Sequence, residues 1–160
     1  MLERLHIKNI AVIDEAEIEF HNGFNVLTGE TGAGKSIIID SINMVLGERT
    51  SKSIIRNGEK KAVVEAMFSI DNQNIAKTLE ENGFDVEDGT IILYRDINTD
   101  GKSLCKINGS MTTASGIREF ANMLINIHGQ QDNQSLLTPS SHINFLNSYA
   151  KIENILSKYR

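Results

Sequence analysis

Residues 29–36 of the chain read Gly-Glu-Thr-Gly-Ala-Gly-Lys-Ser, which is the strongest signal of fold in the sequence. It matches the phosphate-loop pattern G-x-x-x-x-G-K-[ST] at every fixed position. A short apolar run at residues 24–27 precedes it, and apolar residues recur at helical spacing from Ile38 to Leu46, before Gly47. A buried strand, a glycine-rich loop and a helix are therefore predicted in that order. The expected fold class is α/β, with a phosphate-binding loop between a strand and a helix.

The residue types of this loop suit the binding of a nucleotide. Glycines let the backbone turn its N–H groups inward, where they join the positive end of the following helix around phosphate oxygens. Lys35 can reach the β- and γ-phosphates, and Ser36 offers a hydroxyl to Mg²⁺. We expect ATP and Mg²⁺ as cofactors, Lys35 as a catalytic residue and Ser36 as a metal ligand. The predicted nucleotide-binding residues are Gly29, Glu30, Thr31, Gly32, Ala33, Gly34, Lys35, Ser36 and Ile37.

Patterning outside the loop predicts further strands and helices. Strands are expected at residues 4–8, 15–20, 61–70, 90–97, 102–107 and 123–127, with turns at 98–101 and at Asn108-Gly109. A helix capped by Asp71 or Asn72 should end at Gly83, a second should start at Ser115, and a third at Thr138-Pro139. The helical residues expected to face inward are Ile75, Leu79, Ile117, Phe120 and Ala121. An antiparallel β-subdomain is therefore expected beside the phosphate loop.

Composition excludes several classes of protein. Apolar residues make up 40% of the chain, which is ordinary for a globular domain. The single cysteine, Cys105, cannot form an internal disulfide and reads as a small apolar residue in a strand. No apolar run approaches the ~18 residues of a membrane span, and a net charge of −5 argues against a surface coated by nucleic acid. A cytoplasmic protein without a membrane partner is expected.

The reaction is left open by the loop alone. The sequence has no N-K-x-D segment of the kind used for guanine, and no arginine-rich lid typical of small kinases. It also lacks a second apolar strand that ends in a carboxylate able to complete the Mg²⁺ shell, because Asp71 and Asp96 lie in segments that read as antiparallel strands. Part of the active site is therefore expected to lie outside this chain.

Three stretches together resemble one family. They are LERLHIKNIAVIDEAEIEFHNGFNVLTGETGAGKSIIIDSINMVLGER at residues 2–49, Tyr94-Arg-Asp with Gly101-Lys-Ser and Ile107-Asn-Gly109, and INIHGQQDNQSLL at residues 125–137. They look like the N-terminal head segment of the RecN family, bacterial DNA-repair proteins related to the SMC ATPases. The resemblance implies an ABC-type ATPase head split in sequence by a long coiled coil. Residues 1–137 would be its N-terminal lobe, and residues 138–160 a helical segment leading to the coiled-coil arm.

The resemblance implies that this chain is only half of a functional ATPase head. The signature stretch, the Walker B strand and the switch histidine of such heads are not in this chain. The implied partners are the C-terminal lobe of the same head, a second copy of the head across a sandwiched ATP, and DNA in the full-length protein. The implied role is recombinational repair of double-strand breaks, with association with the nucleoid on DNA damage. Hydrolysis of ATP by this chain alone is not expected.

The resemblance also places a loop glutamine at Gln130, which would contact Mg²⁺ and the attacking water. A neutral amide suits both roles, because it can accept from water and donate to phosphate. We therefore expect Gln130 as a second catalytic residue and metal ligand. His128 and Gln131 are neighbours that could take its place, and a solvated loop without function is the alternative.

Other candidates have plainer interpretations. Arg49 could reach a phosphate or DNA, but an arginine near a helix end is more often a dipole partner. The basic cluster of Arg56, Lys60 and Lys61 could touch DNA, but is more often a solvated face. The apolar stripe at residues 143–159 fits either a core or a coiled-coil seam. The histidines without ligand spacing are His6, His21 and His142.

Two rival functions give different expectations. A self-contained phosphotransferase or nucleotide hydrolase on the same loop would show turnover by this chain alone. An interaction fragment with a vestigial loop would bind its partners equally well after Lys35→Ala.

Overall fold

The computed structural model of this chain describes residues 1–29, 34–125 and 127. The chain divides into two compact units, Met1–Asn126 and Ile127–Arg160. The elements described below all belong to the first unit. The helix predicted from Thr138-Pro139 and the apolar stripe at residues 143–159 lie outside the described residues.

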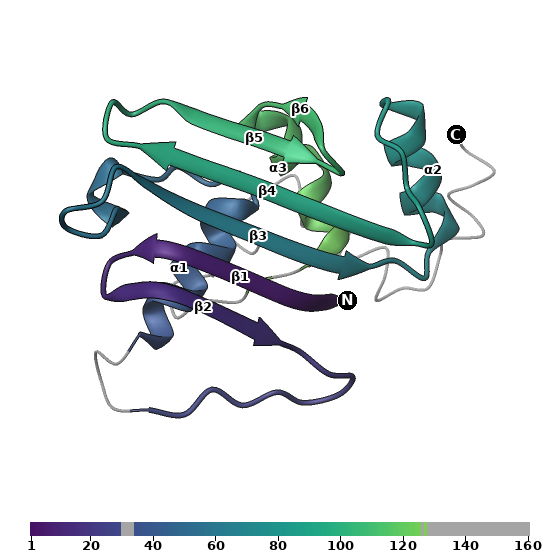
Figure 1. Cartoon of the computed structure of the whole chain (residues 1–160). Helices are drawn as coiled ribbons and strands as arrows, with labels where there is room; N and C mark the ends of the chain where they lie inside the picture. The colour runs from purple at the N-terminus through teal and green to yellow at the C-terminus, as the bar shows by residue number, and fades with distance from the viewer. Residues whose placement is uncertain (30–33, 126, 128–160) are drawn as a thin grey trace, which may run out of the picture. The chain divides into compact units, whose positions relative to one another are not determined.

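A six-stranded antiparallel sheet forms the body of the first unit (Figure 1). Its strands are β1 (Leu2–Ile10), β2 (Ile13–Glu19), β3 (Lys61–Ser69), β4 (Thr90–Asn98), β5 (Ser103–Ile107) and β6 (Ser110–Thr112). They lie side by side in the order β2-β1-β3-β4-β5-β6. The strands predicted at residues 4–8, 15–20, 61–70, 90–97 and 102–107 and the turns at 98–101 and 108–109 are confirmed, and with them the antiparallel β-region.

Register explains how the period-2 pattern builds a core on one face of this sheet. Ile7 on β1 lies opposite Val64 on β3, and Val64 lies opposite Arg95 on β4. Because partners in register point to the same face, the buried residues of successive strands form one layer. The fully buried side chains of this layer include Leu5, Ile7, Val64, Phe68, Ile91, Leu93 and Ile107.

Two helices cover that face. Figure 1 shows α1 (Lys35–Val45) and α3 (Ala114–Leu124) behind the sheet, while α2 (Gln73–Glu81) lies beyond the ends of the strands β3 and β4 that it connects. A short 3-10 helix, η1 (Lys52–Ile54), follows α1. Helix α1 packs on β1, β3 and β4, and α3 packs on β5. The helix predicted after the phosphate loop is therefore confirmed, and it is anchored on the central strands.

The helix ends follow the predicted capping chemistry with one shift. The side chain of Asn72 caps α2 by accepting from the N–H of Asn74 at 2.9 Å. Helix α3 is capped by Thr113, whose hydroxyl oxygen accepts from the N–H of Gly116 at 3.0 Å, so the helix begins one residue before the predicted Ser115. Of the residues predicted to face inward, Leu79, Ile117, Phe120 and Ala121 are buried, whereas Ile75 is only half-buried.

The strand predicted at residues 24–27 is wrong. Phe24 is 94% exposed, Val26 63% and Leu27 43%, and these residues belong to no strand. A strand needs a neighbour for its backbone hydrogen bonds, and none of the described strands pairs with this run. A turn before it is closed by Asn25, whose side-chain amide accepts from the N–H of His21 at 3.1 Å and donates to its carbonyl oxygen at 2.8 Å. The apolar run is thus held out in solvent.

The strand predicted at residues 123–127 is also wrong. Met123 and Leu124 form the last turn of α3, and Ile125 and Ile127 are not in a strand. A short apolar run carries no period long enough to separate strand from helix. Here the helical spacing of Ile117, Phe120 and Ala121 against the sheet continues the helix by one more turn.

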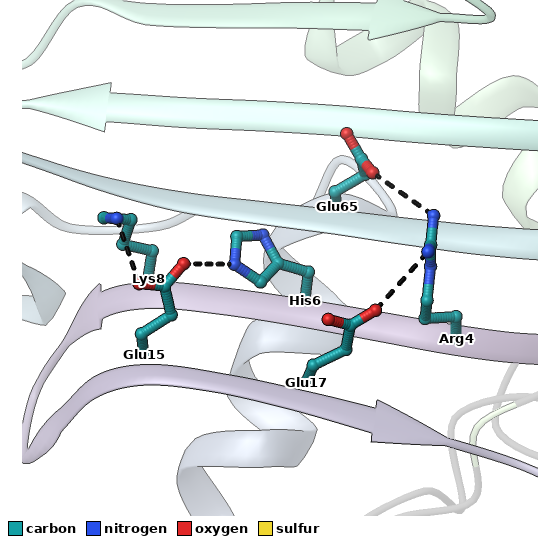
Figure 2. Close-up of polar contacts among 6 residues, drawn as sticks. All are labelled: Arg4, His6, Lys8, Glu15, Glu17 and Glu65. Atoms are coloured by element: carbon teal, nitrogen blue, oxygen red, sulfur yellow. Dashed lines mark hydrogen bonds and ion pairs between the residues drawn. The ribbon is translucent and has the colours of Figure 1, made fainter.

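The opposite face of the sheet carries paired charges (Figure 2). None of the described helices covers it. Arg4 on β1 lies between Glu17 on β2, at 3.4 Å, and Glu65 on β3, at 4.0 Å. This face alternates in sign across the strands, as expected for the solvated side of an antiparallel sheet.

Two further pairs of this charged face meet at Glu15. The Nε2 atom of His6 lies 2.9 Å from one of its carboxylate oxygens, and the Nζ atom of Lys8 lies 3.1 Å from the other (Figure 2). The hydrogen bond with His6 and the ammonium of Lys8 lower the pKa of Glu15. His6, which has no metal-ligand spacing in the sequence, therefore has a structural role as a partner of Glu15 on the charged face.

Candidate functional site

The described residues of the phosphate loop meet at the start of α1. They are Gly29, Gly34, Lys35, Ser36 and Ile37; the predicted site residues Glu30, Thr31, Gly32 and Ala33 lie outside the described part of the chain. Gly34 is the N-cap residue of α1, with φ +97°. Only glycine adopts this backbone conformation without strain, which explains the last glycine of the motif.

The N-cap residue of α1 makes no side-chain cap of the first helical turn. Gly34 has no side chain to accept from the N–H groups of the turn, and no acidic residue lies in it. The N–H of Ile38 donates to the carbonyl oxygen of Gly34 at 3.1 Å, which closes the first helical turn. The N–H groups before it, together with the positive end of the helix dipole, suit an anion such as phosphate.

Lys35 and Ser36 stand on this first turn. The ammonium of Lys35 donates a hydrogen bond to the carbonyl oxygen of Gly29, so the lysine spans the loop from its last residues to its first. The side chain of Lys35 is half-buried, and Ser36 is exposed. A cation and a hydroxyl therefore flank the N-terminus of α1, which is the donor set expected for a phosphate with a bound Mg²⁺.

The other end of α1 is closed by a turn centred on Gly47. The N–H of Glu48 donates to the carbonyl oxygen of Asn43 at 3.0 Å, and that of Gly47 to Met44 at 3.1 Å. These two bonds form the Schellman motif, and Gly47 has the positive φ, +91°, that the motif requires. The predicted C′ role of Gly47 is confirmed.

Two arginines from other elements bind this C-terminal end of α1. Arg95 on β4 is buried, 6% exposed, and its Nη1 donates to the carbonyl oxygens of Met44 and Glu48, both at 2.7 Å. Arg118 on α3 donates to the carbonyl oxygen of Gly47 and lies 3.4 Å from the carboxylate of Glu48. The charge of an arginine is favourable at the negative end of a helix dipole.

Arg95 is held from behind by the β4–β5 hairpin. Its Nε donates to the hydroxyl of Ser103 at 3.1 Å, and that hydroxyl donates to the carbonyl oxygen of Asp96 at 2.7 Å. Burial lowers the pKa of Arg95. Sequence reasoning quoted Tyr94-Arg-Asp and Gly101-Lys-Ser only as family features and assigned Arg95 no role. Its only local signal is a charged residue at an inward position of an otherwise apolar strand.

Asp96 is engaged on the charged face of the sheet. Its carboxylate accepts from the hydroxyl of Tyr94 at 3.1 Å and lies 3.9 Å from the Nζ atom of Lys61. Burial and the neighbouring carboxylate of Asp96 raise the pKa of Tyr94 to about 12. The expectation that Asp96 belongs to an antiparallel strand is confirmed. Among the described residues, no group of three or more His, Cys, Asp or Glu side chains could hold a metal ion.

The remaining candidates separate into structural and exposed residues. Arg56 donates to the carbonyl oxygen of Val12 at 2.7 Å, and Lys61 pairs with Asp96, so two members of the basic cluster have structural partners. Arg49 and Lys60 are exposed. Gln130, with its neighbours His128 and Gln131, lies outside the described residues.

The structure also tests the predictions made for Cys105 and for membrane-spanning helices. Cys105 is buried in β5 as predicted, and burial raises the pKa of its thiol. In the part of the chain that the structure describes, no helix is long and apolar enough to cross a membrane.

Comparison with known proteins identifies the family of the chain and agrees with its fold. The model of the AAA domain family matches residues 4–160. The chain is 44% identical over its whole length to the DNA repair protein RecN of Bacillus subtilis and 42% identical to that of Halalkalibacterium halodurans. It spans 28% and 29% of the length of these two relatives.

A solved structure from work on ATP-driven dimerization and DNA-stimulated activation of SMC ATPases has the same fold. It superposes with a TM-score of 0.65 at 25% identity, over 91% of this chain and 97% of that one. The α/β fold of a P-loop ATPase lobe is therefore confirmed, and the family implies nucleotide binding. The chain belongs to the AAA domain family, has the fold of an SMC-like ATPase head and, with all of its own residues, matches 28% of the DNA repair protein RecN of Bacillus subtilis.

Proposed function

We propose that this chain is the ATP-binding half of an SMC-like head that acts in the recombinational repair of DNA double-strand breaks. The observation that carries the proposal is the start of α1, where Gly34 leaves the first helical turn without a side-chain cap beside Lys35 and Ser36. Phosphate is the ligand that such a helix start fits best, because it supplies both the acceptors and the negative charge.

Each loop residue has a distinct task in this proposal. The backbone from Gly29 to Ile37 holds the phosphates, and Lys35 neutralises charge on the β- and γ-phosphates. The hydroxyl of Ser36, together with Gln130, would hold Mg²⁺, which when bound neutralises the phosphates further. Gln130 would orient the attacking water.

The exposed apolar residues support the second half of the proposal, that the head is completed by a C-terminal lobe. Phe24, Val26 and Leu27 lie exposed just before the loop, and Ile39 on α1 is 48% exposed. Large apolar side chains exposed in this way are typical of a surface that another part of a protein covers. The chain spans 28% of the length of its RecN relative, so most of such a protein lies outside it.

The wider assembly follows from the same family. Residues 1–137 would form the N-terminal lobe, and residues 138–160 would lead to a coiled-coil arm. A second head would close on the bound ATP, and the full-length protein would contact DNA in the cytoplasm and join the nucleoid after damage. ATP would join the two heads, and hydrolysis would release them, because the γ-phosphate supplies the contacts between them.

Binding of Mg-ATP to this chain, measured by titration calorimetry, tests the proposal. We expect saturable binding that Lys35→Ala weakens by about tenfold or more, since a hydrogen bond to a charged group contributes about 1.5–3 kcal/mol. Lys77→Ala on α2 is the matched control, because it removes the same charge from an exposed surface pair with Glu81. Equal binding by the wild-type and Lys35→Ala chains, or no binding by a folded wild-type chain, would overturn the proposal.

A further inference from the structure

Arg95 is a charged residue buried in the apolar layer of the sheet, where its burial costs free energy. It occupies an inward position of β4, where its register partners are Val64 on β3 and Cys105 on β5, both buried. Burying a guanidinium is costly, and an apolar side chain of similar size at such a position is often neutral or more stable. A buried arginine in an apolar layer therefore suggests a requirement other than stability.

The contacts of Arg95 identify that requirement. Among the residues that the structure describes, no carboxylate lies within ion-pairing distance of it; its acceptors there are the carbonyl oxygens of Met44 and Glu48 and the hydroxyl of Ser103. The counter-charge is the negative end of the α1 dipole. One rigid, planar group thus joins the last turn of α1 to two strands of the sheet, a task that suits arginine and that lysine performs less well.

The opposite end of the same helix is the candidate phosphate site. Helix α1 has 11 residues, and Lys35 is its first residue. A helix is stiff over so short a length, so fixing its last turn against the sheet also fixes where its first turn lies. A shift of about 1 Å in a binding group is enough to weaken its contacts strongly.

We propose that Arg95 is a positioning residue for the phosphate loop: by holding the C-terminal turn of α1 against β4 and β5, it sets the place of Lys35 and Ser36 for the nucleotide. The inference rests on the proposed nucleotide binding at this loop. Arg118 assists from the surface, but it is 46% exposed and its pair with Glu48 is open to solvent, so its contribution is smaller.

The test is the affinity of the chain for Mg-ADP, measured at a temperature at which circular dichroism shows every variant to be folded. Arg95→Met removes all three hydrogen bonds and is expected to weaken binding about tenfold. Arg95→Lys keeps a cation and can restore a contact to the carbonyl oxygens, so it should lose only about threefold. Arg118→Met should change the affinity less than Arg95→Met does.

The control separates positioning from stability. Ile107→Ala creates a cavity in β5, the strand on which α3 packs, and destabilises the same sheet without touching the contacts of Arg95 with α1. Its folded molecules should bind Mg-ADP as the wild type does. Unchanged affinity in Arg95→Met, or an equal loss in Ile107→Ala, would overturn the inference and leave Arg95 a purely structural residue. If Arg95→Met does not fold, the same comparison is made with Arg95→Lys.

The two proposals fail in different ways. A folded wild-type chain that does not bind Mg-ADP or Mg-ATP contradicts the proposed function, and the inference falls with it. Binding that depends on Lys35 but is indifferent to Arg95 contradicts the inference alone.

Discussion

Gly47 and Ala114 touch backbone to backbone: a Cβ atom at Gly47 would overlap the carbonyl oxygen of Ala114. The turn at the end of α1 therefore lies so close to the start of α3 that no side chain fits between them. Glycine is required at position 47 for two reasons: it has no Cβ atom to overlap Ala114, and it adopts the positive φ of the Schellman turn without strain.

We expect Gly47→Ala to destabilise the chain by about 3 kcal/mol or more, because it adds a steric overlap to the strain of a left-handed residue. Gly58→Ala is the matched control: Gly58 has nearly the same φ, +90° against +91°, and no atom within 4 Å of the added Cβ. The control should cost about 1–2 kcal/mol, from strain alone. Urea unfolding measures both. Equal losses would mean that the α1–α3 approach contributes nothing.

The purified chain should show no ATP hydrolysis that depends on Lys35. Of the two carboxylates considered for the Mg²⁺ shell, Asp96 lies in an antiparallel strand and is engaged with Tyr94 and Lys61. Steady-state phosphate release in the presence of Mg²⁺ measures the rate, with Lys35→Ala reporting contaminating ATPase. Turnover that disappears in Lys35→Ala would favour a self-contained hydrolase instead. Activity restored by adding the remainder of a RecN-like protein would support the half-head.

Tyr94 should ionise about two pH units later than a free tyrosine, since its pKa is raised from 10.0 to about 12. The folded state keeps the phenol neutral where the unfolded chain ionises it. This contribution to stability is present below pH 10 and is lost as the pH rises from about 10 to about 12. Phenolate absorbance during a pH titration measures the ionisation, and Tyr94→Phe identifies which signal belongs to this residue.

Asp96→Asn separates the two causes of that shift. Burial is the larger cause and persists in the variant, whereas the negative charge of Asp96 is removed. The pKa of Tyr94 should therefore fall, but remain above 10. A value that stays at about 12 would show that Asp96 has no influence on the phenol.

Phe24→Ser should leave the stability of the chain within about 0.5 kcal/mol of the wild type, because the side chain is 94% exposed. The same variant should reduce association, whether with a C-terminal lobe or between copies of this chain, since it removes the largest apolar group of the exposed run. Analytical ultracentrifugation over a range of concentrations measures the self-association. Phe68→Ala, which alters a fully buried ring, should instead cost about 3–5 kcal/mol. Loss of stability in Phe24→Ser would show that the ring packs against the chain.

Sequence patterns predicted the elements whose signals are local. The alternation around Leu5 and Ile7, the cap at Asn72 and the C′ glycine at Gly47 each depend on a few neighbouring residues, and each is confirmed. The run at residues 24–27 was mispredicted because its apolar content says nothing about which strand would pair with it. Burial of such a run depends on a partner elsewhere, and none of the described elements supplies one.

The residues of the candidate site also differ in whether local sequence could predict them. The motif predicted Gly34, Lys35 and Ser36 at the start of α1, because the glycine-rich loop and the helix that follows it are encoded in consecutive residues. The role of Arg95 depends on which helix end lies beneath its strand, 51 residues from Met44 in the chain. No rule based on sequence spacing predicts that contact. The predicted site therefore included the residues at the start of α1 but not Arg95 at its C-terminal end.

The two outer strands of the sheet differ in how they resist aggregation. The open edge at β2 carries Glu15, Glu17 and Glu19 at alternate positions, so a second copy approaching it in register would meet a row of like charges. The opposite edge strand, β6, has only three residues, so it exposes too few backbone groups for a strand of another molecule to pair with. Unwanted strand addition is therefore discouraged at both borders by different means. Among the described residues, the exposed apolar run at residues 24–27 is a different kind of surface, since its side chains and not its backbone would make the contact.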